Sequence, residues 1–140
     1  MRQLLKNRKD IRIVGDRFVF QSEVLFPSGS AQMSVTGLAA LDELAKAILE
    51  LSRAIPKEID WALQVDGHTD IRPINSPQFP SNWELSTARA ISVVRYLASR
   101  GVPPSRLVAA GFGEHRPLDR GNSEEALRRN RRIELKLTNR

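Results

Sequence analysis

The segment of residues 61–90 constrains the fold most, because its sequence pattern changes from that of a β-strand to that of an α-helix, with a proline-rich stretch between the two. Alternating apolar residues at 61–66 predict a β-strand. Residues 71–80 include three prolines, which cannot continue a helix or a central strand, so they predict an irregular loop. Ser81 and Glu84 have the spacing of a capping box, which predicts that a helix begins directly after this loop.

The rest of the chain adds helices and strands in alternation. Such alternation favours helices packed on a sheet that is at least partly parallel, which is an α/β fold class. One domain is expected over residues 11–140, after a charged N-terminal extension of residues 1–10. Residues 11–14 and 17–20 predict a small hairpin or a bent first strand. The other predicted elements are a loop over 22–34, a helix over 38–51 capped by Thr36, a strand over 106–110, a helix capped by Asn122 that ends near Asn130, and a strand over 133–137.

Composition and charge exclude some classes of protein and leave others open. The chain contains no cysteine, which excludes disulfides and Cys-ligated zinc. It has no run of about 18 apolar residues, so no membrane-spanning helix is expected. Residues 1–70 hold 9 basic and 10 acidic side chains, whereas residues 71–140 hold 13 and 6. This imbalance favours a polyanionic partner such as nucleic acid, an acidic membrane surface or an acidic wall polymer, or else forms a solvated basic surface.

Asp70 and Arg89 are the strongest candidates for contacts with a ligand. Asp70 follows the predicted strand, and Arg89 lies in the middle of the predicted helix. A carboxylate can accept hydrogen bonds from a ligand ammonium, and a guanidinium can bind a carboxylate in bidentate fashion. Together the two could grip a ligand that carries both groups. Each also has a structural alternative, because Asp70 can cap the following loop and Arg89 can be solvated or paired within its own helix.

A metal site is a second hypothesis for the end of the strand. If the strand period continues, Asp66, His68 and Asp70 share one face, and carboxylates and imidazole are suitable metal ligands. Two-residue spacing is common by chance, however, and His68 can instead be hydrogen-bonded within a turn. The chain has neither a cysteine nucleophile nor a Gly-x-Ser-x-Gly motif. The protein is therefore expected not to be an enzyme, with a metal-dependent hydrolase as the enzymatic alternative.

A run of basic residues near the C-terminus suggests a different function. Residues 128–132 include four arginines and lead into the last predicted strand. Such a run can bind nucleic-acid phosphates. Aromatic residues are not interleaved with it, as they would be on a base-stacking surface. A nucleic-acid or other polyanion-binding module through the basic C-terminal half is therefore the alternative to a ligand groove.

Beyond these residues, several motifs follow one another in order over about residues 18–138. They are VLFPSGSA at 24–31, GHTD at 67–70, NWELSTARA at 82–90, Gly101, Arg106, GFG at 111–113, Pro117 and NRRIE at 130–134. Together they resemble the OmpA-like peptidoglycan-binding domain. The loop with Pro73 and the NWELS run are most similar to the MotB branch, the periplasmic part of flagellar motor stator proteins.

This resemblance implies a βαβαβαβ mixed sheet with helices packed on it and a groove for the peptide stem of peptidoglycan. At the matching positions, Asp70 would bind the ammonium of diaminopimelate and Arg89 its carboxylate. Binding would be non-covalent and would need no metal or cofactor. The other positions that the resemblance places in the groove are Thr69, Asn82, Leu85, Ser86 and Arg131.

The resemblance also implies a place in the cell. The domain would lie in the periplasm of a Gram-negative cell envelope and anchor a membrane or motor protein to the wall. Its tether to the membrane would be a segment of a longer parent chain that is not present here. The resemblance also allows the domain to form a homodimer. One departure concerns the loop after the strand. Many family members have glycine shortly after the Asp, whereas this chain has Ile71-Arg72-Pro73.

Overall fold

The computed structural model describes residues 12–14 and 17–139. The N-terminal extension expected over residues 1–10 lies outside the described residues. No helix within the described ranges combines the length and the apolar character needed to cross a bilayer.

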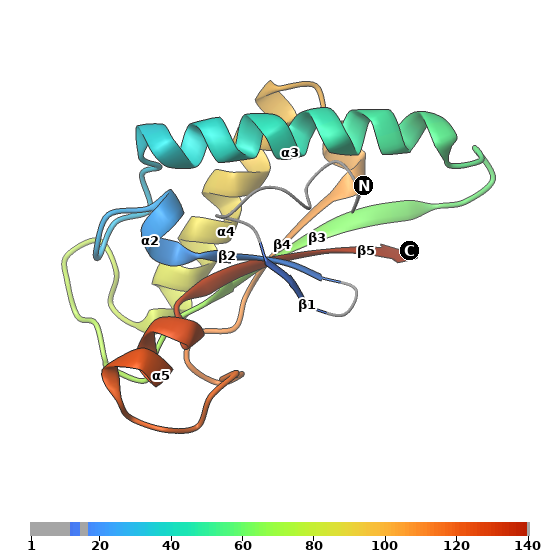
Figure 1. Cartoon of the computed structure of the whole chain (residues 1–140). Coiled ribbons are helices and arrows are strands. Elements are labelled where there is room, and N and C mark those ends of the chain that lie inside the picture. Colours follow the sequence, from blue (N-terminus) through green and yellow to red (C-terminus); the bar gives the residue numbers. More distant parts are fainter. Residues whose placement is uncertain (1–11, 15–16, 140) are drawn as a thin grey trace.

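A five-stranded mixed sheet forms the centre of the fold, as Figure 1 shows. Strands β3 and β4 are parallel, and the other neighbouring strands are antiparallel. The predicted α/β class with a mixed sheet is therefore confirmed. In the order β1-β2-β5-β3-β4, the strands are β1 (Arg12–Val14), β2 (Arg17–Gln21), β5 (Arg132–Asn139), β3 (Trp61–His68) and β4 (Leu107–Gly111).

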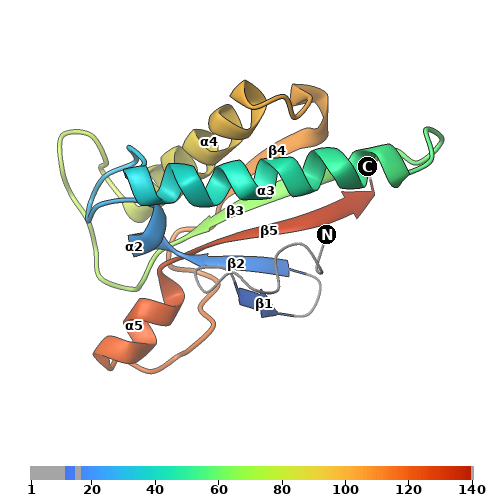
Figure 2. The ribbon, with the colours of Figure 1, turned by 45° about the horizontal axis from the view of Figure 1, so that its top comes forward.

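Two long helices, α3 (Val35–Ala54) and α4 (Asn82–Ser99), cover one face of the sheet (Figure 2). The side chains between these helices and the sheet form the hydrophobic core. Short elements complete the chain. The single turn α2 (Ser22–Leu25) precedes α3, the 3-10 turn η1 (Pro104–Arg106) precedes β4, and α5 (Glu124–Asn130) precedes β5. The core includes Phe20, Phe26, Leu41, Leu44, Ile48, Leu63, Val65, Leu97, Ile133 and Leu135.

Most of the predicted elements are present, with differences at their ends. The hairpin of β1 and β2, the irregular loop over 71–80 and the capping box at the start of α4 are confirmed. Ser34 caps α3 in place of Thr36, because its hydroxyl accepts a hydrogen bond from the amide of Gly37. Ser123 rather than Asn122 caps α5. The expected loop over 22–34 is also wrong at its start, where α2 forms.

Two glycines allow α4 to approach the sheet closely. A Cβ atom at Gly67 of β3 would lie 2.2 Å from the backbone oxygen of Ser86. At Gly111 of β4 it would lie 2.1 Å from the side-chain oxygen of Thr87. Both contacts involve the first turns of α4. The absence of a side chain at these two positions therefore sets the distance between this helix and the end of β3, where Asp70 follows.

Candidate functional site

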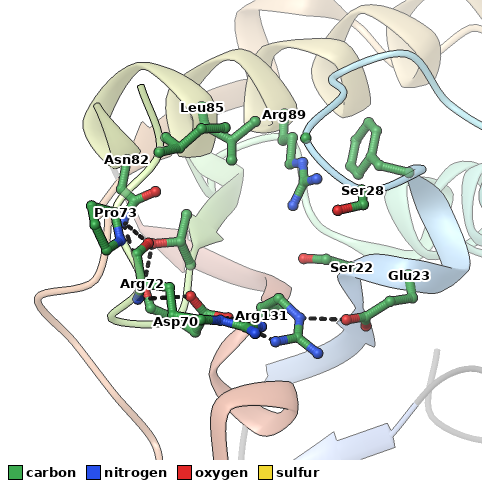
Figure 3. Close-up of a pocket in the computed structure, with 14 residues that line it drawn as sticks. Ser22, Glu23, Ser28, Asp70, Arg72, Pro73, Asn82, Leu85, Arg89 and Arg131 are labelled. Carbon is green, nitrogen blue, oxygen red and sulfur yellow. Dashed lines mark hydrogen bonds and ion pairs between the residues drawn. The ribbon is translucent and has the colours of Figure 1, made fainter. Parts of the chain in front are cut away.

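A groove of about 360 Å³ opens at the end of the sheet where β3 finishes. Figure 3 shows its lining side chains, which come from α2 and the loop that follows it, the loop after β3, the first half of α4 and the residue before β5. The groove therefore gathers segments that are far apart in the sequence. It is lined by Ser22, Glu23, Phe26, Ser28, Gly29, Thr69, Asp70, Arg72, Pro73, Ile74, Asn82, Leu85, Arg89 and Arg131.

Backbone contacts at the end of β3 hold Asp70 in place. The amide of Thr69 donates a hydrogen bond of 2.9 Å to the carbonyl of Gly113, and the Thr69 hydroxyl donates to the carbonyl of Asp70. The side-chain amide of Asn82 donates to the carbonyl of Arg72 at 3.0 Å. These bonds join the loop both to the turn after β4 and to the start of α4. Asp70 is buried except for its face toward the groove.

The carboxylate of Asp70 accepts hydrogen bonds from two arginines. Arg72 donates to it from its backbone amide and from its guanidinium, and Arg131 donates at 2.7 Å. Burial by itself would raise the pKa of Asp70, but these hydrogen bonds outweigh it and hold the pKa below its usual value. Asp70 is therefore ionised at neutral pH. Arg131 is held from its other side by an ion pair with Glu23.

Arg89 lies on the opposite wall of the groove and supports the segment that precedes α3. Its Nε donates to the carbonyl of Ser30 at 2.8 Å, and its Nη2 donates to that of Pro27 at 3.3 Å. The guanidinium lies 5.2 Å from the centre of the Phe26 ring. Only 5% of Arg89 is exposed, and burial lowers its pKa. The guanidinium nevertheless remains charged at neutral pH, as arginine does in proteins.

The charges around the groove do not balance. Two arginines, Arg72 and Arg131, pair with Asp70, and Arg131 pairs with Glu23 as well. Among the described residues, no carboxylate lies within salt-bridge distance of Arg89. The lining therefore carries one excess positive charge, at a buried guanidinium that faces the groove (Figure 3). A buried cation of this kind is stabilised by an anionic ligand group.

Six of the seven residues expected in a binding site line this one groove. They are Asp70, Arg89, Thr69, Asn82, Leu85 and Arg131. Ser86 does not line it. Its hydroxyl is buried below the first turns of α4, where it donates to the carbonyl of Trp83 and accepts from the amide of Gly113.

Two charged residues of the groove were not expected from the sequence. Glu23 lies on α2, in a segment that was predicted to be a loop. It accepts a hydrogen bond from Arg131, which is 108 residues away in the sequence. Arg72 lies in the predicted loop. The only sign of its importance in the sequence was that this loop lacks the glycine that is common in the family.

A buried charged cluster lies on the face of the sheet opposite the core. It contains Asp66 and His68 of β3 together with Glu134 of β5, and their ligating atoms lie within 4.8 Å of one another. Asp70 is not part of it, so the predicted set of Asp66, His68 and Asp70 is wrong. Arg17 and Arg132 both donate to Glu134. Both guanidiniums also interact with Asp66 through their charge, so two arginines balance the two carboxylates, and a divalent cation would leave an excess of buried positive charge.

His68 in this cluster has no hydrogen-bond partner at either ring nitrogen among the described residues. Its ring is 4% exposed and stacks on Phe112 with centroids 5.0 Å apart. The predicted hydrogen bond of His68 within a turn is therefore not present. Burial, together with the charge of Arg132, lowers the pKa of His68 to about 4.

This lowered pKa predicts a loss of stability in mild acid. The unfolded histidine titrates near pH 6.5, so between about pH 6.5 and 4 the unfolded chain binds a proton that the folded chain does not. The free energy of unfolding should fall by about 2 kcal/mol from pH 7 to pH 5. Urea unfolding at the two pH values measures it. His68→Phe keeps the stacked ring and should lose most of this fall.

The matched control is His115→Phe, because His115 is exposed and also stacks on an aromatic ring, that of Trp83. It should keep the pH dependence of the wild type. An equal fall in stability for His68→Phe and for the wild type would show that another group causes the acid sensitivity.

Comparisons with known proteins agree with this architecture. The model of the OmpA family matches residues 25–131. An uncharacterized protein of Bacillus subtilis (strain 168), YtxE, is 38% identical over 118 residues, which are 84% of this chain and 46% of YtxE. The chain therefore spans about half the length of this curated relative.

Two solved structures are similar over nearly the whole chain. A putative MotB-like protein from Desulfovibrio vulgaris has a TM-score of 0.86 and 29% identity, covering 99% of this chain and 89% of that one. The cell wall anchor of the T6SS from Pseudomonas aeruginosa has a TM-score of 0.83 and 28% identity, covering 99% and 96%. These likenesses agree with the resemblance to the MotB branch. With a family model that matches most of its length, the chain belongs to the OmpA family.

Proposed function

We propose that this domain is a non-enzymatic module that binds cell-wall peptidoglycan through the diaminopimelate of its peptide stem. The observation that carries the proposal is the pair of opposite charges in one groove. Asp70 lies on one wall and Arg89 on the other, and Arg89 has no carboxylate partner among the described residues. The free end of diaminopimelate carries one ammonium and one carboxylate, so it offers a partner to each wall.

The rigidity of the two walls supports recognition of such an end as a unit. Asp70 is fixed by the end of β3, and Arg89 projects from α4, which rests on Gly67 and Gly111. Because neither group has to be ordered when the ligand arrives, little entropy is lost at the protein. Each charge-assisted hydrogen bond can then contribute about 1.5–3 kcal/mol.

Family membership and the solved relatives support a role in anchoring. The Pseudomonas aeruginosa relative is described as a cell wall anchor, and other similar structures are periplasmic domains of Helicobacter pylori MotB. We place this domain in the periplasm, where it would hold a membrane or motor protein to the wall. The membrane tether would lie in a longer parent chain, and a homodimer would strengthen attachment to a repeating polymer.

Co-sedimentation with purified diaminopimelate-type sacculi at physiological salt tests the proposal. The wild type should pellet, and Asp70→Asn should largely remain in the supernatant, because the amide cannot neutralise the ligand ammonium. Asp119→Asn is the matched control. Asp119 also pairs with an arginine and accepts a backbone hydrogen bond, but it lies outside the groove.

Both substitutions remove one negative charge, so nonspecific attraction to an anionic polymer rises equally in the two variants. Pelleting of Asp119→Asn but not of Asp70→Asn therefore places binding in the groove. Equal pelleting of all three proteins would mean that the basic surface adheres to the wall, and the site assignment would be wrong. A wild type that never pellets would contradict wall binding itself.

The alternative, a polyanion-binding surface on the basic C-terminal half, receives less support from the structure. Within the run of four arginines, Arg129 pairs with Asp119 and Glu125, and Arg132 is buried against Glu134. Arg131 pairs with Glu23 and Asp70. These guanidiniums would have to leave their acids to bind phosphates. Phosphate-driven binding should also weaken steeply with added salt, whereas binding in a small groove should not.

A further inference from the structure

The carboxylate of Asp70 is almost fully occupied before any ligand arrives. Its Oδ2 accepts three hydrogen bonds, from Nε of Arg72 at 3.1 Å, Nη2 of Arg72 at 2.8 Å and Nη1 of Arg131 at 2.7 Å. Its Oδ1 accepts the backbone amide of Arg72 at 2.9 Å. An ionised carboxylate has about four acceptor sites in total. A ligand ammonium with three donors therefore finds little free capacity at Asp70.

The two arginines that occupy Asp70 are held very differently. The side chain of Arg131 is 21% exposed and is fixed from both sides by Glu23 and Asp70. The side chain of Arg72 is 54% exposed, and its guanidinium directs both of its bonds to the single Oδ2 atom. Its remaining acidic neighbour is Glu124, at 3.7 Å on the rim. The Arg72 guanidinium is half exposed and can be solvated on leaving, and Arg131 would still pair with Asp70, so Arg72 is the partner that can leave.

We propose that the Arg72 side chain is a displaceable internal cation that occupies the place of the ligand ammonium on Asp70 in the free groove. This inference rests on the proposed function. On binding, the ammonium takes over Oδ2, and the Arg72 guanidinium turns toward the rim and Glu124. The backbone amide of Arg72 remains on Oδ1, because the bond of Asn82 to the Arg72 carbonyl holds the backbone.

Such a competitor affects which ligands bind. A ligand whose amine is charged can replace the guanidinium, since one cation exchanges for another on the same carboxylate. A ligand whose amine is absent or acylated has nothing to offer Asp70 and leaves Arg72 in place. Arg72 therefore lowers the affinity for the charged amine, and its removal should increase the discrimination between the two kinds of ligand.

Calorimetric titration with two soluble peptides tests this inference. One is the tripeptide L-alanyl-γ-D-glutamyl-meso-diaminopimelate, and the other is its analogue without the free amine on the side chain. The measured quantity is the ratio of the two dissociation constants. In Arg72→Gln the preference for the amine should increase about two- to fivefold over the wild type, as expected for removal of a competing guanidinium that is itself half exposed.

Arg100→Gln is the matched control. The side chain of Arg100 is 51% exposed and pairs with Asp42 at 2.9 Å, away from the groove. This variant loses the same charge and should keep the wild-type ratio. The analogue accounts for the general effect of lost charge on an anionic ligand, because that effect acts on both peptides.

The possible outcomes distinguish a failure of the inference about Arg72 from a failure of the proposed function. Binding of the tripeptide with an unchanged or reduced preference for the amine in Arg72→Gln overturns the inference and leaves the proposed function standing. An unchanged ratio with an affinity for both peptides that falls well below that of Arg100→Gln would show that Arg72 contacts the ligand directly, which also overturns the inference. If neither the wild type nor Arg72→Gln binds the tripeptide, the proposed function fails and the inference fails with it.

Discussion

Replacing Gly67 with alanine is expected to destabilise the domain by at least about 3 kcal/mol. The new Cβ atom would lie 2.2 Å from the backbone oxygen of Ser86 and 2.9 Å from its carbonyl carbon. Backbone atoms inside a helix cannot move aside as the end of a flexible side chain can, so α4 as a whole would have to shift away from β3. Thermal or urea unfolding followed by circular dichroism measures the loss.

Gly121→Ala is the control for this substitution. Its Cβ atom would lie 3.1 Å from the side-chain oxygen of Asp119, which can adjust, and 3.5 Å from Ala126. We expect a change within about 1 kcal/mol. If Gly67→Ala were as stable as Gly121→Ala, the close packing of α4 on β3 would be wrong. A folded but weakened Gly67→Ala variant should also bind the wall less well, because the displaced helix carries Arg89.

Replacing Arg89 with lysine is expected to weaken tripeptide binding about tenfold or more. Lysine keeps the positive charge but loses the planar fork. The guanidinium uses Nε and Nη2 for the carbonyls of Ser30 and Pro27, and it can offer its remaining donors to a ligand carboxylate at the same time. A single ammonium at the end of a flexible chain cannot make all these bonds in one geometry.

The same substitution should lower stability moderately, because two backbone carbonyls lose a charged donor. We expect about 1–3 kcal/mol, so binding must be measured well below the melting temperature. Arg106→Lys is the matched control. Arg106 also donates to a backbone carbonyl and lies 5.1 Å from the ring centre of Trp61, but outside the groove. Arg89→Lys binding as tightly as Arg106→Lys would contradict the proposed role of Arg89 in binding the ligand carboxylate.

Elements bounded by strong local signals could be predicted from the sequence. The prolines of residues 71–80 and the Ser81–Glu84 capping box act over a few residues, and both agree with the structure. The cap of α3 could not be predicted in the same way. The Ser34 hydroxyl accepts from Gly37 and also donates to the carbonyl of Val24 at 3.0 Å, a contact that depends on how α2 packs.

The groove was predictable only in part, for a related physical reason. Asp70 and Arg89 could be identified because Asp70 follows a strongly patterned strand, Arg89 lies within a strongly patterned helix, and both are inside recognisable motifs. Glu23 could not, because its pairing with Arg131 depends on the register of β2 and β5, in which Gln21 lies opposite Arg132. Similarly, the sequence placed His68 near two acids but gave no sign that both its ring nitrogens would be buried without a partner in the part of the chain that the structure describes.

The position of β3 in the sheet has a mechanical consequence. Asp70 follows β3 closely, and this strand is paired with β5 along its whole length and with β4 along much of it. A tensile force applied to a ligand on Asp70, directed along β3, would load these two rows of hydrogen bonds in shear. Bonds loaded in shear share the force and must break together, whereas bonds peeled from an edge strand break one at a time. A pull on the groove along β3 would therefore be resisted by both rows of hydrogen bonds together.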